Sequence, residues 1–247
     1  MLSLVLLLFF TPLYALPTGF VYLREHAPTI SQDIRYAGFH NFVGRPIRGY
    51  KARECILTEA AAQALAKVQK ALNRVGLSLK VYDCYRPLMA SDDFLVWSKE
   101  INHQKMKAEF YPNVEKQDFF RLGYVAEKSA HNRGSTVDLT LISQGSSSAP
   151  YHPGQPLYAC TAPYAKRYRD NSVDMGTGYD CMDKRSHVSN HYIGVTAFTH
   201  RILLRHLMVK YGFVPYNKEW WHFTLKSEPY PDQNFNFVVK KPSPHEL

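Results

Sequence analysis

The sequence feature that most constrains the fold is a short stretch containing a histidine, a glycine and an aspartate. His131 and Asp138 stand seven residues apart, with Gly134 between them. Glycine adopts backbone angles that other residues avoid, so the chain can turn sharply after His131 and run back past it. Residues 136–141 then alternate polar and apolar side chains, which is typical of a strand. We expect the apolar face of this strand to pack on the core and Asp138 to face a cleft beside His131.

A distant histidine, His222, completes a set of possible metal ligands with His131 and Asp138. Structural zinc is usually enclosed by four protein ligands, mostly thiolates. Two imidazoles and one carboxylate instead leave a fourth position free for a water or a substrate oxygen. The set therefore predicts one catalytic zinc ion per chain, although the same ligands would accept other divalent ions.

Hydrolysis at such a metal also requires a base for the water and a cation or donor for the oxyanion. Glu219, three residues before His222, is the candidate base. Arg86 is the candidate cation, because Pro87 holds it in an extended conformation and Asp83 is near. Regular pleating would put Glu219 and His222 on opposite faces of a strand, so we expect Glu219 at the strand's mouth or on a bulge. Each residue alone could be an ordinary core or surface residue, but together they predict a peptide hydrolase.

Hydrophobic periodicity predicts further regular elements. We expect strands over residues 33–37, 77–83 and 219–225, and helices over 59–75, 88–110 and 196–211. At 247 residues and 45% apolar composition, the chain can bury a sizeable core, which favours one compact domain over two.

Residues 1–15 carry no charged side chain and include an apolar run that resembles the hydrophobic region of a secretory signal. The run is short for a membrane span. We expect cleavage after Ala15, a mature domain over 16–239 and a proline-rich, disordered tail over 240–247. An uncleaved membrane anchor is the alternative. The expected location is the periplasm or the extracellular space.

Export makes the four cysteines interpretable as two disulfides. Cys55, Cys84, Cys160 and Cys181 allow three pairings. We favour Cys55 with Cys84 and Cys160 with Cys181, because each bridge then closes a local loop; four buried free thiols are the alternative. No C-x-x-C motif occurs, which disfavours a thiolate zinc site.

A net charge of +9 raises the question of nucleic-acid binding. The Lys and Arg residues are scattered, and no nucleic-acid motif is recognisable, so we expect a solvated basic surface and no nucleic-acid partner.

A long irregular segment over residues 143–171 contains four prolines, and such segments are usually lids or binding loops when ordered. It leads into a loop with two glycines between Asp174 and Asp180. Either aspartate could face a cationic ligand group, or both could serve only as turn residues.

Four motifs occur in an order that resembles the zinc D-alanyl-D-alanine dipeptidases of the VanX kind. They are Tyr85-Arg86-Pro87, Ser129-x-His131-x-x-Gly134-x-x-x-Asp138, Asp174-Met175-Gly176-Thr177 and Glu219-Trp220-Trp221-His222. The likeness runs from about residue 33 to residue 225. The His-Asp and Glu-x-x-His pieces are shared with D,D-carboxypeptidases and with the amino-terminal domain of hedgehog proteins.

This resemblance implies an α+β fold in which helices pack on a small antiparallel sheet. The site residues it implies are the zinc ligands His131, Asp138 and His222, the base Glu219, the oxyanion-stabilising Arg86, and Ser129 and Asp174 near the ammonium group of the substrate. This chain departs from the family at Thr136, where alanine is common, and in the longer segment before Ser172. We expect Thr136 to narrow the cleft or to bond to a ligand.

The activity implied by the resemblance is that of a zinc metallopeptidase which uses a zinc-bound water to hydrolyse D-alanyl-D-alanine to two D-alanine molecules. Because residues 1–15 resemble a secretory signal, we expect an exported enzyme that acts in cell-wall peptide turnover. Its partner would be a small D,D-dipeptide. One alternative is a D,D-carboxypeptidase or endopeptidase that trims peptidoglycan stems. The other is a zinc-binding protein without catalysis, as in hedgehog.

Overall fold

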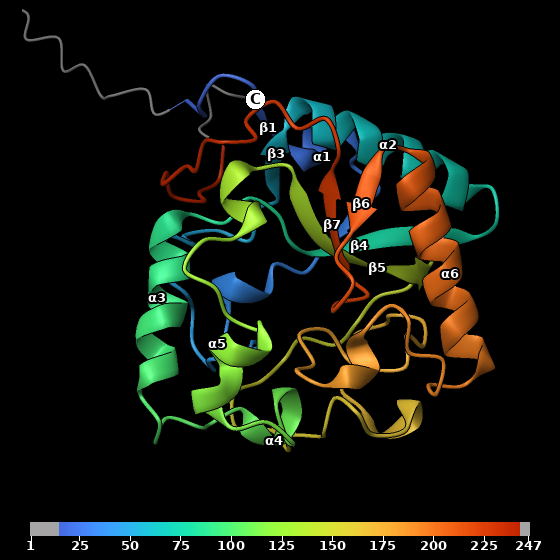
Figure 1. Ribbon diagram of the computed structural model, residues 1–247. Coiled ribbons are helices and arrows are strands. Elements are labelled where there is room, and N and C mark those ends of the chain that lie inside the picture. Colours follow the sequence, from blue (N-terminus) through green and yellow to red (C-terminus); the bar gives the residue numbers. More distant parts are fainter. Residues whose placement is uncertain (1–14, 243–247) are drawn as a thin grey trace, which may run out of the picture.

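The computed structural model of the protein describes residues 15–242 (Figure 1). The expected signal segment, apart from Ala15, and residues 243–247 of the expected tail lie outside this range. Over the described range the chain forms the expected α+β fold around a single hydrophobic core. No helix between residues 15 and 242 is long and apolar enough to cross a membrane.

A five-stranded sheet forms the centre of the molecule (Figure 1). Its strands, in spatial order, are β2 (Ser31–Gln32), β4 (Leu77–Asp83), β5 (Thr136–Ser143), β7 (His222–Leu225) and β6 (Phe213–Pro215). All neighbours are antiparallel except β2 and β4, so the sheet departs from the expected pattern at that edge. The register places Asp138 directly opposite His222. Two ligands predicted from distant parts of the chain are therefore neighbours in the sheet.

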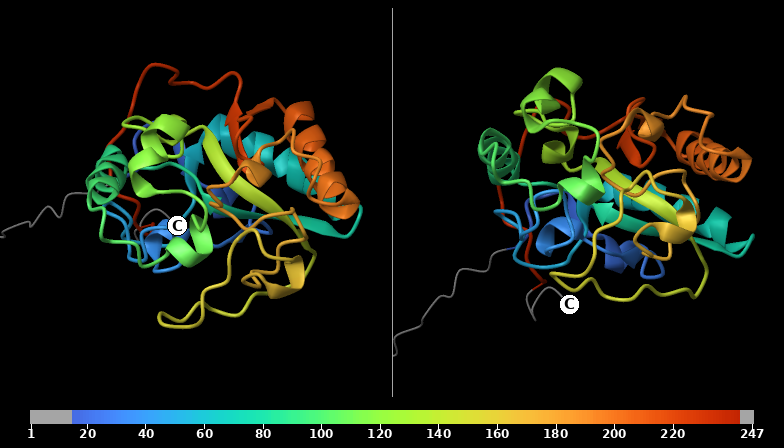
Figure 2. Two further views of the ribbon diagram at one scale, coloured as in Figure 1. Left: turned by 60° about the horizontal axis from the view of Figure 1, so that its bottom comes forward. Right: turned by 90° about the horizontal axis from the view of Figure 1, so that it is seen from below.

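Two long helices pack together and against the central strands (Figure 2). Helix α2 (Glu59–Asn73) follows Thr58 at its N-terminus, and α6 (Val195–Lys210) precedes β6, so both expected helices are confirmed within a residue or two. Each turns its apolar side chains inward, as helical spacing requires. The inward residues are Ala61, Leu65, Val68 and Leu72 on α2, and Ala197, Leu204 and Met208 on α6.

A group of shorter helices lies at the left and toward the bottom of Figure 1. It comprises α3 (Leu88–Lys99), α4 (Lys107–Phe110) and α5 (Phe119–Leu122). The single helix expected over residues 88–110 is wrong, because the chain leaves α3 after Lys99. The buried ammonium of Lys116 binds the carbonyls of Glu100 and His103, which stabilises the non-helical connection.

The amino-terminal part of the described chain forms a separate two-stranded sheet. Strand β1 (Phe20–Tyr22) pairs with β3 (Ile56–Thr58), and the one-turn helix α1 (Leu23–His26) follows β1. The strand expected over residues 33–37 is wrong, because residues 35–37 form a 3-10 turn. Arg35 in that turn is buried against Asp33 and Asp170, and these ion pairs fix the turned chain.

Both disulfides form in the pairing that closes local loops. Cys55 pairs with Cys84, and Cys160 pairs with Cys181. No free cysteine remains in the described chain. Cys84 follows the last residue of β4, and Cys181 lies in the loop between Ser172 and α6.

Candidate metal centre and active site

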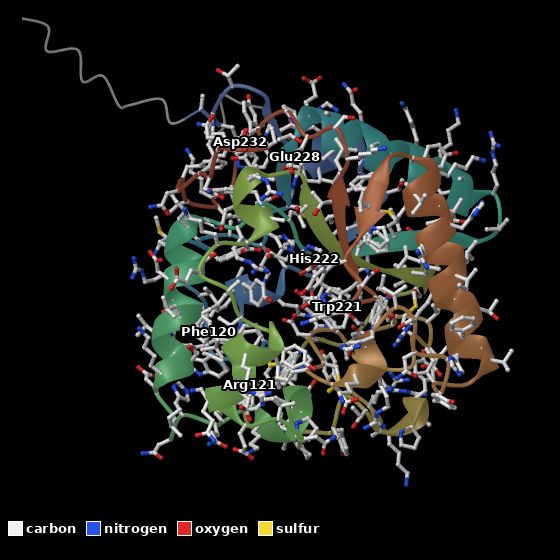
Figure 3. The ribbon with its side chains drawn as sticks, in the orientation of Figure 1. Phe120, Arg121, Trp221, His222, Glu228 and Asp232 are labelled. Carbon is white, nitrogen blue, oxygen red and sulfur yellow. A yellow bond between two sulfur atoms is a disulfide. The ribbon has the colours of Figure 1, made fainter. Side chains whose placement is uncertain are left out.

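The three predicted metal ligands come from three elements that meet at one end of the central strands. His131 lies in a short 3-10 turn (Ala130–Arg133), Asp138 lies on β5, and His222 is the first residue of β7. Gly134 ends the turn with φ 81°, which confirms the sharp reversal expected from the sequence. Figure 3 shows His222 and Trp221 near the middle of the molecule, between the α3–α5 side and α6.

The ligand atoms of these residues form a nearly equilateral triangle. His131 Nε2 lies 3.2 Å from Asp138 Oδ1 and 3.3 Å from His222 Nδ1, and the remaining side, from His222 Nδ1 to Asp138 Oδ1, is 3.1 Å. Tetrahedral zinc with bonds of about 2.0–2.1 Å holds neighbouring ligand atoms about 3.3 Å apart. The donor set and its spacing therefore fit a zinc-sized divalent ion. Among residues 15–242 the group comprises these three ligands, so a four-coordinate ion would take its fourth ligand from water or substrate.

Hydrogen bonds from outside the triangle orient the ligands. His131 Nδ1 donates to the carbonyl of Cys84 at 2.7 Å, which leaves Nε2 free for a metal. The second carboxylate oxygen of Asp138 accepts from the Tyr179 hydroxyl at 3.0 Å. Burial alone would raise the pKa of Asp138, but His131 and His222 hold that pKa well below its usual range. The carboxylate is therefore in the ionised form that a metal ligand requires.

Glu219 lies in the turn just before β7, at the strand's mouth as expected. Its Oε2 is 3.5 Å from His222 Nδ1. Burial raises the pKa of Glu219 to about 7, in opposition to His222, which lowers it, and with a further contribution from Asp138, which raises it. A carboxylate with a pKa near neutrality can both accept and return a proton.

Arg86 is held rigidly at the end of β4. Its Nε and Nη2 donate to Asp83 Oδ2 at 3.0 and 2.9 Å, and the guanidinium lies over the rings of Tyr36 and Phe94. Asp83 is fully buried and also accepts from the Tyr50 hydroxyl at 2.6 Å. The guanidinium is thus a fixed cation, in line with the sequence argument.

A cavity of about 270 Å³ brings these groups together. Its lining includes the predicted residues Arg86, Ser129, His131, Asp138, Glu219 and His222. Ser129 also caps the turn that carries His131, because its Oγ accepts from the His131 N–H at 3.3 Å.

Asp174 is not among the residues that line the cavity, so the structure does not bring it together with the other expected site residues. Its carboxylate pairs with Arg167 and accepts from the Gly176 N–H. The chain turns at Gly176, where φ is 82°, and the second aspartate of this loop, Asp180, reaches the cavity instead. Spacing alone had left the choice between these two carboxylates open.

Asp180 is a half-buried carboxylate without a cationic partner among the described residues. Its Oδ2 accepts from the Tyr36 hydroxyl at 2.8 Å, and it makes no ion pair with any described residue. Burial, followed by the nearby Asp138, raises the pKa of Asp180 well above its usual range. A bound cationic group would favour the charged form.

Two parts of the chain that we expected at the walls of the cavity do not line it. Thr136 does not line it, because its hydroxyl bonds to that of Thr224 at 2.9 Å across the sheet. The long segment over residues 143–171 does not cover it either. Instead, Tyr151 and Tyr168 of this segment pack against the ring of His40 (segment in yellow, Figure 2).

Comparisons with known proteins point to a single family. A model of the D-ala-D-ala dipeptidase family matches residues 17–149 and 164–240, leaving 150–163 without a counterpart. A D-alanyl-D-alanine dipeptidase of Enterococcus faecalis is 38% identical over 221 residues, which cover 90% of this chain and 98% of the relative. One of Streptomyces coelicolor is 37% identical over 89% of this chain and 98% of its own length. One of Escherichia coli is 30% identical over 87% and 89%.

Proposed function

The chain belongs to the D-alanyl-D-alanine dipeptidase family, and from this premise we propose that it is an exported zinc metallopeptidase. In this proposal it hydrolyses free D-alanyl-D-alanine to two D-alanine molecules, in cell-wall peptide turnover. The observation that carries the proposal is the meeting of a three-atom ligand triangle, a carboxylate with a raised pKa and a fixed guanidinium in one cavity.

His131, Asp138 and His222 would hold the zinc ion. When bound, zinc supplies a Lewis acid that polarises the scissile carbonyl and lowers the pKa of a water molecule. Glu219 accepts the proton of the attacking water and passes it to the leaving amine, a transfer that its pKa of about 7 favours. Arg86, held by Asp83, stabilises the negative charge that develops on the carbonyl oxygen.

Two further residues suit the charged ends of a free dipeptide. Asp180 pairs with the ammonium group, which replaces the missing cationic partner of this carboxylate. Lys128 also lines the cavity and makes no ion pair with any described residue, so we assign it to the substrate carboxylate. A cavity of about 270 Å³ lies just below the usual range for ligand sites, which favours a dipeptide over a peptidoglycan stem.

Export is supported by the two disulfides, because reducing compartments rarely preserve them. The apolar, uncharged residues 1–15 support it independently.

The experiment that tests the function is D-alanine release by the purified, zinc-loaded chain. D-Ala-D-Ala, L-Ala-L-Ala and N-acetyl-D-Ala-D-Ala are supplied in parallel. We expect cleavage of the free D,D-dipeptide alone, since acetylation removes the ammonium and leaves Asp180 buried without a cation. Preference for the acetylated substrate would identify a carboxypeptidase, and failure to cleave any of the three would favour a binding protein.

A further inference from the structure

We propose that the Cys160–Cys181 disulfide positions Asp180, and that recognition of the substrate's free ammonium group therefore depends on residues 150–163. This inference rests on the proposed dipeptidase function. It assigns a role in substrate selection to a segment that has no counterpart in the family model.

Asp180 needs external support because its backbone is in an unfavourable region. Its φ is 55°, in the left-handed region that residues with side chains adopt uncommonly. No helix or strand fixes the chain between Ser172 and the 3-10 turn Lys184–Ser186. The position of the carboxylate therefore depends on its bond from the Tyr36 hydroxyl and on the contacts of the residues on either side of it.

Cys160 contacts the chain on both sides of Asp180. Its sulfur is bonded to Cys181, the residue immediately after Asp180. Its carbonyl accepts from the Gly178 N–H at 2.9 Å, two residues before Asp180. The Cys160 N–H in turn donates to the carbonyl of Glu109 in α4 at 2.8 Å, so the loop is tied to the helical side of the molecule.

The segment that contributes Cys160 does not itself line the cavity. The family model matches up to residue 149 and resumes at 164, so Cys160 belongs to the inserted stretch. No residue from 150 to 163 lines the cavity, whereas Cys181 does. We therefore infer that the segment acts on the ligand by placing the loop that presents Asp180.

The other disulfide lies beside the metal ligands, which makes the two bridges distinguishable. The carbonyl of Cys84 accepts from His131 Nδ1, so the Cys55–Cys84 bridge supports the metal ligands. The Cys160–Cys181 bridge supports the carboxylate for the ammonium. Losing the second bridge should weaken substrate binding without lowering the metal content.

The test is the double variant Cys160→Ala/Cys181→Ala, zinc-loaded and assayed with D-Ala-D-Ala. We expect KM to rise about tenfold while kcat changes less than about twofold, because binding is lost and the chemical groups stay in place. Zinc stoichiometry, measured by elemental analysis, should equal that of the wild type. Cys160→Ser/Cys181→Ser is a second version if the alanine pair does not fold.

A double-mutant cycle with Asp180→Asn separates positioning from general loosening. If the bridge acts through Asp180, removing the bridge from the Asp180→Asn variant should raise KM only slightly further. Additive effects of the two changes, an unchanged KM in the bridge variant, or a parallel loss of kcat and zinc would each overturn the inference. The wild-type assay is run first, so a failure of the proposed dipeptidase function would appear there and not in the variants.

Discussion

At the scale of single residues, the site depends on carboxylates whose surroundings give them different charge states. Asp138 is kept ionised by the two histidines, although it is buried. Glu219 is shifted in the other direction by burial. Two carboxylates a few ångströms apart can therefore take different roles, one as a ligand and one as a proton carrier.

Replacing Glu219 should separate metal binding from catalysis. We expect Glu219→Gln to bind zinc as the wild type does while kcat falls by about 10²-fold or more, since the general base is lost. Elemental analysis and steady-state kinetics measure the two properties. Glu127→Gln, an exposed change outside the cavity, is the matched control. Normal turnover in Glu219→Gln would contradict the assigned role.

The raised pKa of Glu219 also predicts a pH dependence of stability in the metal-free protein. A carboxyl group whose pKa is higher in the folded state binds more protons there, so stability falls as pH rises from its unfolded pKa to about 7. The loss from this group is on the order of 3 kcal/mol. Urea unfolding of the chelated protein across this range measures it. The same titration should be shallower for Glu219→Gln, and identical slopes would count against the shift.

Lys128 should recognise the carboxylate end of the substrate. We expect Lys128→Met to raise KM for D-Ala-D-Ala by about tenfold, as loss of one charged contact would. D-alanyl-D-alaninamide lacks the carboxylate and serves as the control substrate. Its KM should be similar in the wild type and in Lys128→Met. Equal effects on the acid and the amide would show that the charge of Lys128 is not what matters.

At the scale of elements, the site is built from a tight turn and two paired strands. The turn after His131 closes at Gly134, and the pairing of β5 with β7 sets Asp138 opposite His222. The geometry of the metal ligands therefore depends on backbone packing at the turn as much as on the ligands themselves.

Gly134→Ala should destabilise this turn through a steric clash in addition to backbone strain. A Cβ at residue 134 would lie 2.2 Å from Phe20 Cε1, so the turn or the ring must move. We expect a loss of about 2–4 kcal/mol in unfolding free energy and a weaker zinc affinity. Gly145→Ala is the control, since Gly145 has φ 76° but no atom within 4 Å of the added Cβ. Similar losses in both variants would mean that contact with Phe20 is unimportant.

At the scale of the whole molecule, the metal would connect parts of the chain that are distant in sequence. His131 and Asp138 belong to the middle of the chain and His222 to its last strand. A ligand that binds only the folded state stabilises it by an amount that grows with the logarithm of the free ligand concentration relative to Kd.

Zinc should therefore raise the free energy of unfolding, by about 3 kcal/mol at a free concentration of about 100 times Kd. Chelation should remove this gain. Asp138→Asn should lose most of it, whereas Asp232→Asn, an exposed change labelled in Figure 3, should keep it. Thermal unfolding with and without zinc measures the difference. A full zinc response in Asp138→Asn would remove Asp138 from the ligand set.

Much of this architecture follows from local patterns in the sequence. The alternation in β5, the spacing in α2 and α6, and the glycine after His131 act over a few residues, so the sequence predicts them correctly. The same is true of Glu219 at the mouth of β7, because a regular strand could not bring it to His222.

The tertiary structure decided what depends on distant contacts. Where the sequence predicts one long helix after Pro87, Lys116 stabilises the non-helical connection after α3 by binding carbonyls more than ten residues earlier. The choice of Asp180 over Asp174 depends on Arg167 and on the turn at Gly176, and sequence spacing favours neither. The segment before Ser172 has the composition of a lid. Its residues Tyr151 and Tyr168 nevertheless pack against the ring of His40, and the segment does not line the cavity. In these cases the deciding contacts are made with particular residues outside the pattern that defines the element, so the local pattern does not contain them.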